Sequence, residues 1–340
     1  MSATGTAVRA RRRIAPALAP ESTPPSGLPG RVVVALGGNA LIRRGERGEF
    51  ESQRRNTDMA ASVIVKLAET VPEVVVTHGN GPQVGFLSLQ AEAGLPDVPA
   101  PPLDVLGAET QGQIGYLLSQ SLRNAFGGRE DPREIAVVLT QVVVAVDDPA
   151  FQRPTKPVGP VYDETKARRL AGERGWTVAP DNQHWRRVVP SPAPRRIVEA
   201  AVIRRLVQAG ALVIASGGGG IPVVEDDGLG LRGVEAVIDK DLAAVVLAED
   251  VRAEALLLLT DVDGVYRGWG TPERERIPLL TVDEAEAMLA SGVLPAGSMA
   301  PKVRACTQFI RAGGKVAAIG PLDAATEVLL GQTGTRIVRA

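Results

Sequence analysis

Lysine is scarce in this chain, and three lysines stand where a charge could act on a ligand. Six of the 38 basic residues are lysines, so arginine supplies most of the other cations. Lys156 lies between prolines, Lys240 begins a predicted helix between Asp239 and Asp241, and Lys302 begins another. Because a lysine ammonium is a compact point charge, we expect these three to act on a phosphoryl group. For each alone, a solvated surface position is the ordinary alternative.

Glycine or polar turns follow four apolar segments that are predicted to be strands. The turns are Gly37-Gly38-Asn39, His78-Gly79-Asn80-Gly81, Ser216-Gly217-Gly218-Gly219-Gly220 and Thr260-Asp261-Val262-Asp263-Gly264. Glycine has no Cβ, so its backbone N–H can approach an anion closely. The first three turns predict contacts with an anion such as phosphate, with plain tight turns as the alternative. His78 is expected to be structural rather than a general base.

The glycine turns do not follow the two common nucleotide patterns. No G-x-x-x-x-G-K-[ST] segment occurs, and no G-x-G-x-x-G follows the first predicted strand. A bound nucleotide would therefore have its phosphates held in another way. Asp261 and Asp263 could belong to a metal site, a nucleoside pocket or a turn, and this spacing alone is insufficient for Mg²⁺ ligation.

Strands and helices alternate along the part of the chain that carries these turns. The predicted strands are 32–36, 74–76, 135–146 (one strand or a pair), 212–215, 256–259, 316–319 and 335–338. The predicted helices are 53–70, 103–126, 196–209, 239–248, 282–291 and 301–312. This order predicts an α/β fold, a sandwich with a mostly parallel sheet, and the four turns would converge on one edge.

Two segments depart from the alternation. Residues 147–195 are rich in proline and arginine and read as an insertion, in which Trp176, Trp185 and Val188-Val189 could form a small core. Residues 1–30 contain five prolines and a net charge of +3, and we expect a disordered extension, with a targeting arm as the alternative. The globular domain would span 31–340.

The composition excludes several classes of function. A net charge of −1 and 3% aromatic residues argue against nucleic-acid binding. No apolar run approaches the roughly 18 residues of a membrane span, and we expect a cytoplasmic protein. One cysteine, Cys306, and two histidines exclude an internal disulfide and a zinc cluster, and no residue is assigned as a metal ligand.

Taken in order, these motifs resemble the carbamate kinases of the amino acid kinase superfamily, from about residue 31 to the end of the chain. The segments that carry the resemblance are VVVALGGNAL, THGNGPQVG, LDVLGAETQGQIGYLL, RPTKPVGPVY, ASGGGGIPV, VIDKDLAA, LLLLTDVDGVY and AGSMAPKV. The resemblance implies a three-layer αβα sandwich with an open sheet of about eight strands and a small protruding subdomain at 147–195. It also implies a homodimer.

The implied reaction is reversible phosphoryl transfer between ATP and carbamate, giving ADP and carbamoyl phosphate, within arginine catabolism. Mg²⁺ would be held mainly by nucleotide phosphates and water. The implied catalytic residues are Lys156, Lys240, Asp241 and Lys302. The implied carbamate and phosphoryl site is Gly37, Gly38, Asn39, Gly79, Asn80 and Gly81. The implied nucleotide side is Gly217, Gly218, Gly219, Gly220, Asp261, Tyr266, Met299 and Lys302.

One position departs from the resemblance. Ala300 stands where the family usually has glycine, and Pro301 should push it toward an extended conformation. If this backbone needs a positive φ or passes close to the nucleotide, the methyl group of Ala300 would add strain or steric bulk and weaken nucleotide binding. Two alternatives remain open: a kinase for another small acid, such as a glutamate or acetylglutamate type, and a non-catalytic nucleotide or metabolite sensor.

Overall fold

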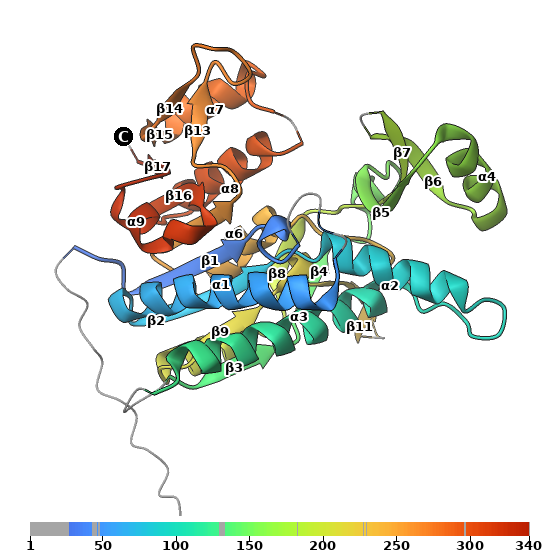
Figure 1. Ribbon diagram of the computed structural model, residues 1–340, viewed down its shortest axis with the longest axis horizontal. Helices are drawn as coiled ribbons and strands as arrows, with labels where there is room; N and C mark the ends of the chain where they lie inside the picture. The colour runs from blue at the N-terminus through green and yellow to red at the C-terminus, as the bar shows by residue number, and fades with distance from the viewer. Residues whose placement is uncertain are drawn as a thin grey trace, which may run out of the picture.

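An eight-stranded sheet forms the centre of the protein (Figure 1). The computed structural model describes residues 27–339 apart from 43–45, 47, 129–132, 182, 227, 229, 296 and the side chain of Asn39. Residues 1–26 of the predicted extension lie outside the described residues. In spatial order the strands are β15 (Leu279–Thr281), β17 (Thr335–Val338), β16 (Val316–Pro321), β12 (Ala255–Thr260), β1 (Arg31–Leu36), β2 (Glu73–His78), β9 (Leu212–Ala215) and β3 (Ile135–Val138).

Helices cover both faces of this sheet because its strands are apolar on both sides. Within β1, Val33 and Ala35 belong to one buried core, whereas Val32 and Val34 belong to the other. The first core is closed by α5 (Ala200–Gln208), α6 (Lys240–Asp250), α7 (Val282–Ala290) and α8 (Met299–Arg311). The second is closed by α1 (Phe50–Thr70), α3 (Leu103–Phe126) and α9 (Ala325–Leu330). The predicted three-layer sandwich is confirmed.

The strands that precede the four turns are neighbours. β12, β1, β2 and β9 lie side by side and are parallel, so their carboxyl ends meet at one edge. The pairing within the sheet is parallel throughout except between β16 and β17. The predicted convergence of the turns is therefore confirmed.

A second, smaller sheet was not predicted. It contains β11 (Gly230–Gly233), β10 (Ile221–Asp226), β4 (Gln141–Val144) and β8 (Pro194–Ile197). Residues 135–146 thus hold two strands, β3 and β4, which belong to different sheets. Outside the two sheets lie the helix α2 (Gly81–Ala93) and the hairpin of β13 (Val265–Arg267) and β14 (Glu275–Ile277). There are also short 3₁₀ turns, η1 (Gly38–Ala40), η2 (Pro149–Phe151), η3 (Gly217–Gly219) and η4 (Leu322–Ala324).

Residues 156–189 of the predicted insertion form a subdomain that projects from the main body (Figure 1), whereas the end of the predicted range at 194–195 belongs to β8 of the second sheet. Its elements are β5 (Lys156–Tyr162), α4 (Glu164–Arg174), β6 (Thr177–Asp181) and β7 (His184–Val189). Val188 and Val189 are buried as expected. The predicted small core forms only in part, because Trp176 and Trp185 are partly exposed and their rings contact arginines. Trp176 lies 5.0 Å from the guanidinium carbons of both Arg174 and Arg187.

Candidate active site

The first two glycine turns lock together at the sheet edge. Gly79 N–H donates to Leu36 O at 3.0 Å, and Gly37 N–H donates to Leu259 O at 2.9 Å. A Cβ on Gly79 would lie 3.0 Å from both the Cα and the N of Gly38. A side chain at Gly79 would therefore push the turns apart. The side chain of Asn39, expected at this site, lies outside the described part of the chain.

Asn80 joins this pair of turns to a helix end. It is buried, and its Nδ2 donates to Thr110 Oγ1 at 2.8 Å. Helix α2 begins at the next residue, Gly81, so its positive end faces the same edge of the sheet as the turns. Thr110 was not predicted as a site residue; its place in the AETQG segment was the available signal.

The glycines of the four-glycine loop are required by its backbone conformation and close packing, not by a need for flexibility. Gly218, Gly219 and Gly220 have φ values of 68°, 95° and 88°, and a Cβ on Gly219 would lie 2.5 Å from Ile238 O. A Cβ on Gly218 would lie 2.2 Å from Asn80 Nδ2. The loop thus fits between Asn80 and the segment that leads into α6, and only glycine meets both demands.

His78 is buried against this loop. Burial is the main reason that its pKa falls from 6.5 to about 4; a hydrogen bond with Gly79 O opposes the shift and the charge of Lys240 adds to it. The ring is therefore neutral at pH 7. A Cβ on Gly217 would lie 2.4 Å from two atoms of this ring. Both observations favour the structural role expected of His78.

The depressed pKa of His78 predicts acid sensitivity. Between pH 6.5 and about 4 the unfolded chain binds a proton that the folded chain does not, so stability falls as the pH falls. From pH 6.5 to 5 the loss should be about 1.6 kcal/mol, because the slope approaches about 1.4 kcal/mol for each pH unit only where the unfolded histidine is mostly protonated. Urea unfolding at both pH values measures it. His78→Gln should lose this part of the slope, and an unchanged slope would contradict the assignment.

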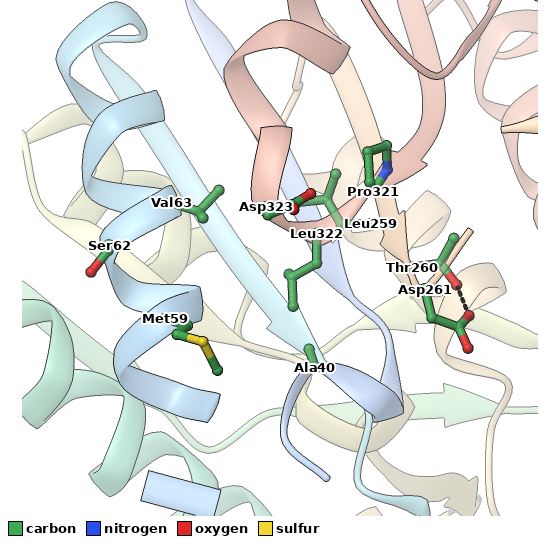
Figure 2. A pocket seen from close by; sticks show the side chains of 10 residues that line it. All are labelled: Ala40, Met59, Ser62, Val63, Leu259, Thr260, Asp261, Pro321, Leu322 and Asp323. Atoms are coloured by element: carbon green, nitrogen blue, oxygen red, sulfur yellow. Dashed lines mark hydrogen bonds between the residues drawn. The ribbon is translucent and has the colours of Figure 1, made fainter. Parts of the chain in front are cut away.

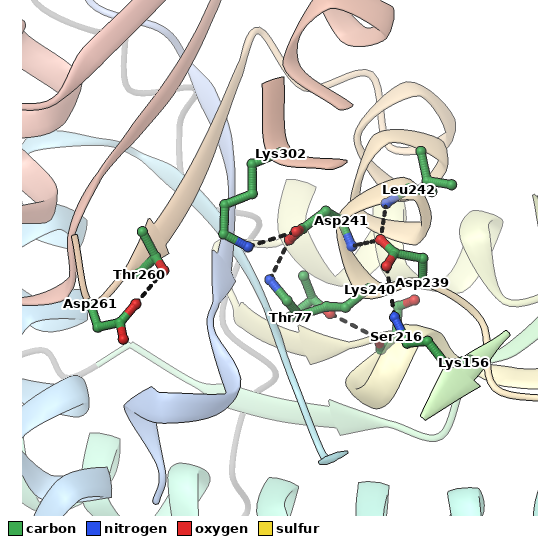
Figure 3. Close-up of polar contacts among 10 residues, drawn as sticks. All are labelled: Thr77, Lys156, Ser216, Asp239, Lys240, Asp241, Leu242, Thr260, Asp261 and Lys302. Atoms are coloured by element: carbon green, nitrogen blue, oxygen red, sulfur yellow. Dashed lines mark hydrogen bonds and ion pairs between the residues drawn. The ribbon is translucent and has the colours of Figure 1, made fainter. Parts of the chain in front are cut away.

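Two of the three candidate lysines share one carboxylate (Figure 3). Lys240 Nζ lies 2.6 Å from Asp241 Oδ1, and Lys302 Nζ lies 2.7 Å from Asp241 Oδ2. All three side chains are mostly buried, with exposed fractions of 14%, 14% and 7%. Lys302, which is 61 positions from Asp241 in the sequence, thus joins Lys240 on this carboxylate. The two lysines and one aspartate form a cluster with net positive charge.

The charged groups of this cluster shift one another's pKa values. Burial opposes ionisation of Asp241, but the charges and hydrogen bonds of Lys240 and Lys302 outweigh it and keep the carboxyl pKa well below its usual range. Burial lowers the pKa of Lys240, an effect that Asp241 opposes and Lys302 reinforces. The excess positive charge makes the cluster a suitable site for an anion such as a phosphoryl group.

The third lysine, Lys156, reaches the same segment from the subdomain. Its Nζ lies 2.8 Å from Asp239 Oδ2 (Figure 3). The other oxygen, Oδ1, accepts the N–H groups of Asp241 at 3.0 Å and Leu242 at 3.3 Å, so Asp239 also caps α6. Burial opposes ionisation of Asp239, yet chiefly because of Lys156 its pKa lies below the ordinary value. Asp239 was not predicted as a site residue, since its position before Lys240 gave no sign of a partner 83 residues away.

The double role of Asp239 predicts a positioning effect on Lys156. Asp239→Asn keeps an oxygen for the helix cap and loses the charge that holds Lys156. We expect kcat to fall about tenfold to a hundredfold, because misplacing a reacting group by about 1 Å can have that effect. The loss should be largely absent in a Lys156→Met background. Asp163→Asn, which alters the cap of α4, is the matched control. Equal losses in both backgrounds would contradict the role.

A small cavity gathers the residues expected on the nucleotide side. Its volume is about 130 Å³, and Asp261, Tyr266, Met299 and Lys302 all line it. Trp269 also lines it, with its ring centroid 5.5 Å from that of Tyr266 in an edge-on contact. Aromatic walls beside a carboxylate and a lysine suit a base, a ribose and a phosphate in sequence. The four-glycine loop does not line this cavity and lies nearer Asn80.

The strain expected at Ala300 is absent. Among the described residues, the non-glycine residues with positive φ are Ser216 and Arg252, and Ala300 lies in the first turn of α8. The expected extended conformation before Pro301 is also wrong. Proline is tolerated in a first helical turn, where its missing N–H has no partner to lose.

Ala300→Gly should therefore leave nucleotide binding unchanged. The KM for ADP should stay within about twofold, and the variant should lose up to about 1 kcal/mol of stability, because glycine is a poorer helix former than alanine. Steady-state kinetics and urea unfolding check the two parts. A several-fold lower KM for ADP would show that the methyl group obstructs the nucleotide.

The described residues contain no group of three His, Cys, Asp or Glu side chains placed to hold a metal ion. The carboxylates of Asp239 and Asp241 are both occupied by lysines. No helix within the described ranges is long and apolar enough to cross a membrane.

Comparisons with known proteins identify the family of this chain. A model of the amino acid kinase family matches residues 30–320. The carbamate kinase of Thermococcus kodakarensis is 51% identical over 313 residues, covering 91% of this chain and 99% of that protein. That of Halobacterium salinarum is 53% identical over 310 residues, covering 91% and 98%. The structure of Giardia lamblia carbamate kinase bound to AMP-PNP has a TM-score of 0.85 and 42% identity, covering 92% of this chain and 99% of that one. The chain belongs to the amino acid kinase family and, within it, to the carbamate kinases.

Proposed function

We propose that the chain transfers a phosphoryl group reversibly between ATP and carbamate at the sheet edge, with the lysine cluster as the catalytic centre. The observation that carries this proposal is the junction of three lysines on Asp239 and Asp241, beside the turns that follow β1 and β2. Carbamate and ATP enter here as the substrates of the kinase family. AMP-PNP in the Giardia relative supports a nucleotide for this chain.

Each part of the site has a distinct role in the proposed transfer. The carbamate and the transferring group would lie against the N–H groups of Gly37–Gly38 and the start of α2. A carbamate oxygen attacks the γ-phosphorus while the bond to the β-phosphate oxygen breaks, and ADP leaves. Carbamate is already an anion, so no general base is needed, which suits a site whose histidine is neutral and buried.

The lysines supply fixed charge for this step. Lys240 and Lys302 would bind the equatorial oxygens of the transferring group, where negative charge is greatest. Asp241 keeps the two ammonium groups apart and oriented. Lys156 would reach the transferring group from the subdomain. The nucleoside would lie at the cavity between Asp261 and Met299, which at about 130 Å³ encloses only part of it.

Magnesium is proposed as part of the nucleotide substrate. The carboxylates nearest the lysines are held by ion pairs, so the described donors do not form a cage for a divalent cation. The ion would be held by phosphate oxygens and water.

We further propose a cytoplasmic homodimer that makes ATP from carbamoyl phosphate in arginine catabolism. The pathway rests on the family resemblance. For the dimer, β3 is an edge strand, and Val137, Leu139 and Tyr116 nearby are 40%, 54% and 59% exposed. Apolar side chains at an unpaired strand edge favour association with a second copy.

A panel of phosphoryl donors tests the proposed reaction. ATP formation from ADP is measured with carbamoyl phosphate, acetyl phosphate and acetylglutamyl phosphate as donors. Carbamoyl phosphate should be preferred over acetylglutamyl phosphate by at least about a hundredfold in kcat/KM, since a pocket fitted to a small substrate excludes a larger one sterically. Acetyl phosphate has the same size as carbamoyl phosphate, with a methyl group in place of the amino group, so it tests recognition of the amino group instead. Preference for acetylglutamyl phosphate would favour a kinase for another small acid. ADP binding without turnover of any donor would favour the sensor.

A further inference from the structure

A larger cavity lies on the other side of the Thr260–Asp261 segment. Its volume is about 630 Å³ (Figure 2). The lining comes from α1, from the ends of β12 and β16, and from the chain after β1: Ala40, Met59, Ser62, Val63, Leu259, Thr260, Asp261, Pro321, Leu322 and Asp323. None of the three lysines of the proposed reaction lines it. Ala40 of η1 and the Thr260–Asp261 segment do line it, so the cavity adjoins the proposed site at the ends of β1 and β12.

The residues that line the cavity favour one class of ligand. Its walls are largely apolar, with Met59 and Val63 on α1 and Leu322 on η4 (Figure 2). Its charged members are two carboxylates, Asp261 and Asp323, and none of the described lining residues is a lysine, arginine or histidine. The carboxylates follow neighbouring strands, since Thr260 of β12 is paired with Pro321 of β16. Such a cavity disfavours phosphates and favours a positive charge carried on an apolar body.

The size of the cavity also suits a small molecule. Ligand sites in proteins typically enclose about 300–1,000 Å³. The cavity of about 630 Å³ lies within this range, whereas the nucleotide-side cavity is about 130 Å³. Thr260 and Asp261 line both cavities. An occupant of the larger cavity would therefore contact a segment that also faces the proposed nucleoside.

We propose that this cavity binds a small organic cation, an aliphatic ammonium or guanidinium compound. Its carbon chain lies along Met59, Val63 and Leu322, and its charge lies near Asp261 and Asp323. Binding is coupled to nucleotide affinity through Thr260–Asp261. Only this coupling rests on the proposed function, because binding of the cation itself requires no turnover.

The test uses four probes with one carbon chain and different head groups: hexylguanidinium, hexylammonium, hexanol and hexanoate. Binding to the full chain is measured by calorimetry and by ligand-observed NMR. The two cations should bind at least about tenfold more tightly than hexanol, and hexanoate should bind more weakly still. Equal affinity for hexanol and the cations would overturn the assignment of a cation site.

Two variants locate the binding. Met59→Trp fills the cavity from a position that is 44% exposed, so folding should be preserved, and it should abolish binding of both cations. Asp323→Asn should weaken cation binding about tenfold and leave hexanol unaffected. Asp283→Asn, an exposed carboxylate paired with Arg311, is the matched control. Cation binding that survives Met59→Trp would place the site elsewhere and overturn the proposal.

The coupling between cation binding and nucleotide affinity is measured separately, through the KM for ADP. Saturating hexylguanidinium should change the KM for ADP at least threefold in the unaltered chain and not in Met59→Trp. An unchanged KM with binding intact overturns the coupling alone. Cation binding by a chain that makes no ATP would overturn the proposed function and leave the cation site standing.

Discussion

Replacing Lys240 by methionine should abolish most ATP formation while leaving the protein folded. The loss in kcat should be about a thousandfold, comparable to the removal of other cations that stabilise phosphoryl transfer. Methionine keeps the apolar length of the buried side chain. Asp241 keeps its ion pair with Lys302 at 2.7 Å, so the carboxylate is not left alone. The coupled assay from ADP and carbamoyl phosphate measures the effect.

A surface lysine provides the control for this variant. Lys315 pairs with Glu254 at 3.1 Å, and its side chain is 69% exposed. Lys315→Met should leave kcat within about twofold, because exposed ion pairs contribute little. Similar rates for Lys240→Met and Lys315→Met would remove Lys240 from the catalytic step.

Replacing Gly219 by alanine should damage both stability and catalysis. The φ of 95° strains any L side chain, and the new Cβ would lie 2.5 Å from Ile238 O. Backbone strain of this kind has an energy of about 1–3 kcal/mol. Because Ile238 leads into Asp239 and Lys240, the displaced backbone would also move the lysine cluster. We expect kcat to fall at least about tenfold, alongside a lower midpoint in urea.

The variant Gly210→Ala is the control that separates the loss of stability from the loss of kcat expected for Gly219→Ala. The φ of Gly210 is 87°, but a Cβ there would meet nothing within 4 Å. Gly210→Ala should lose stability by about 1–3 kcal/mol from strain and keep its kcat. If Gly219→Ala also keeps its kcat, the glycine loop does not position the lysine cluster.

Much of the edge that carries the site could be predicted from local sequence. Val32–Leu36 and Leu256–Leu259 are apolar runs without alternation, which is typical of strands buried on both faces. The turns that follow them mark the carboxyl ends of the strands. Parallel strands place these ends together, so local patterns were enough to predict the meeting of the turns.

Contacts between distant residues could not be predicted in this way. Lys156 and Asp239 meet only because the subdomain projects over the sheet edge. The segment Asp239–Asp241 gave no indication of which carboxylate would hold which lysine. Trp176 was expected in a core, but the nearby arginines Arg174 and Arg187 cover its ring instead. These outcomes depend on tertiary packing rather than on hydrophobic periodicity.

The same limit explains the error at Ala300. A residue before proline usually avoids the helical region, yet the backbone of Ala300 is helical. Its N–H donates to Pro295 O at 3.1 Å, and its side chain packs against the core beneath α8. Both contacts come from the preceding turn and the tertiary fold.

Nucleotide binding by the Lys240→Met variant tests most directly whether the lysine cluster contacts the transferring phosphoryl group. Calorimetry compares AMP-PNP, which carries a γ-phosphoryl group, with AMP, which does not. The variant should bind AMP-PNP at least about tenfold more weakly than the unaltered chain, because a buried charge-assisted contact is lost. Its affinity for AMP should stay within about threefold. Unchanged affinity for AMP-PNP, or an equal loss for both nucleotides, would contradict a cluster built around the transferring phosphoryl group.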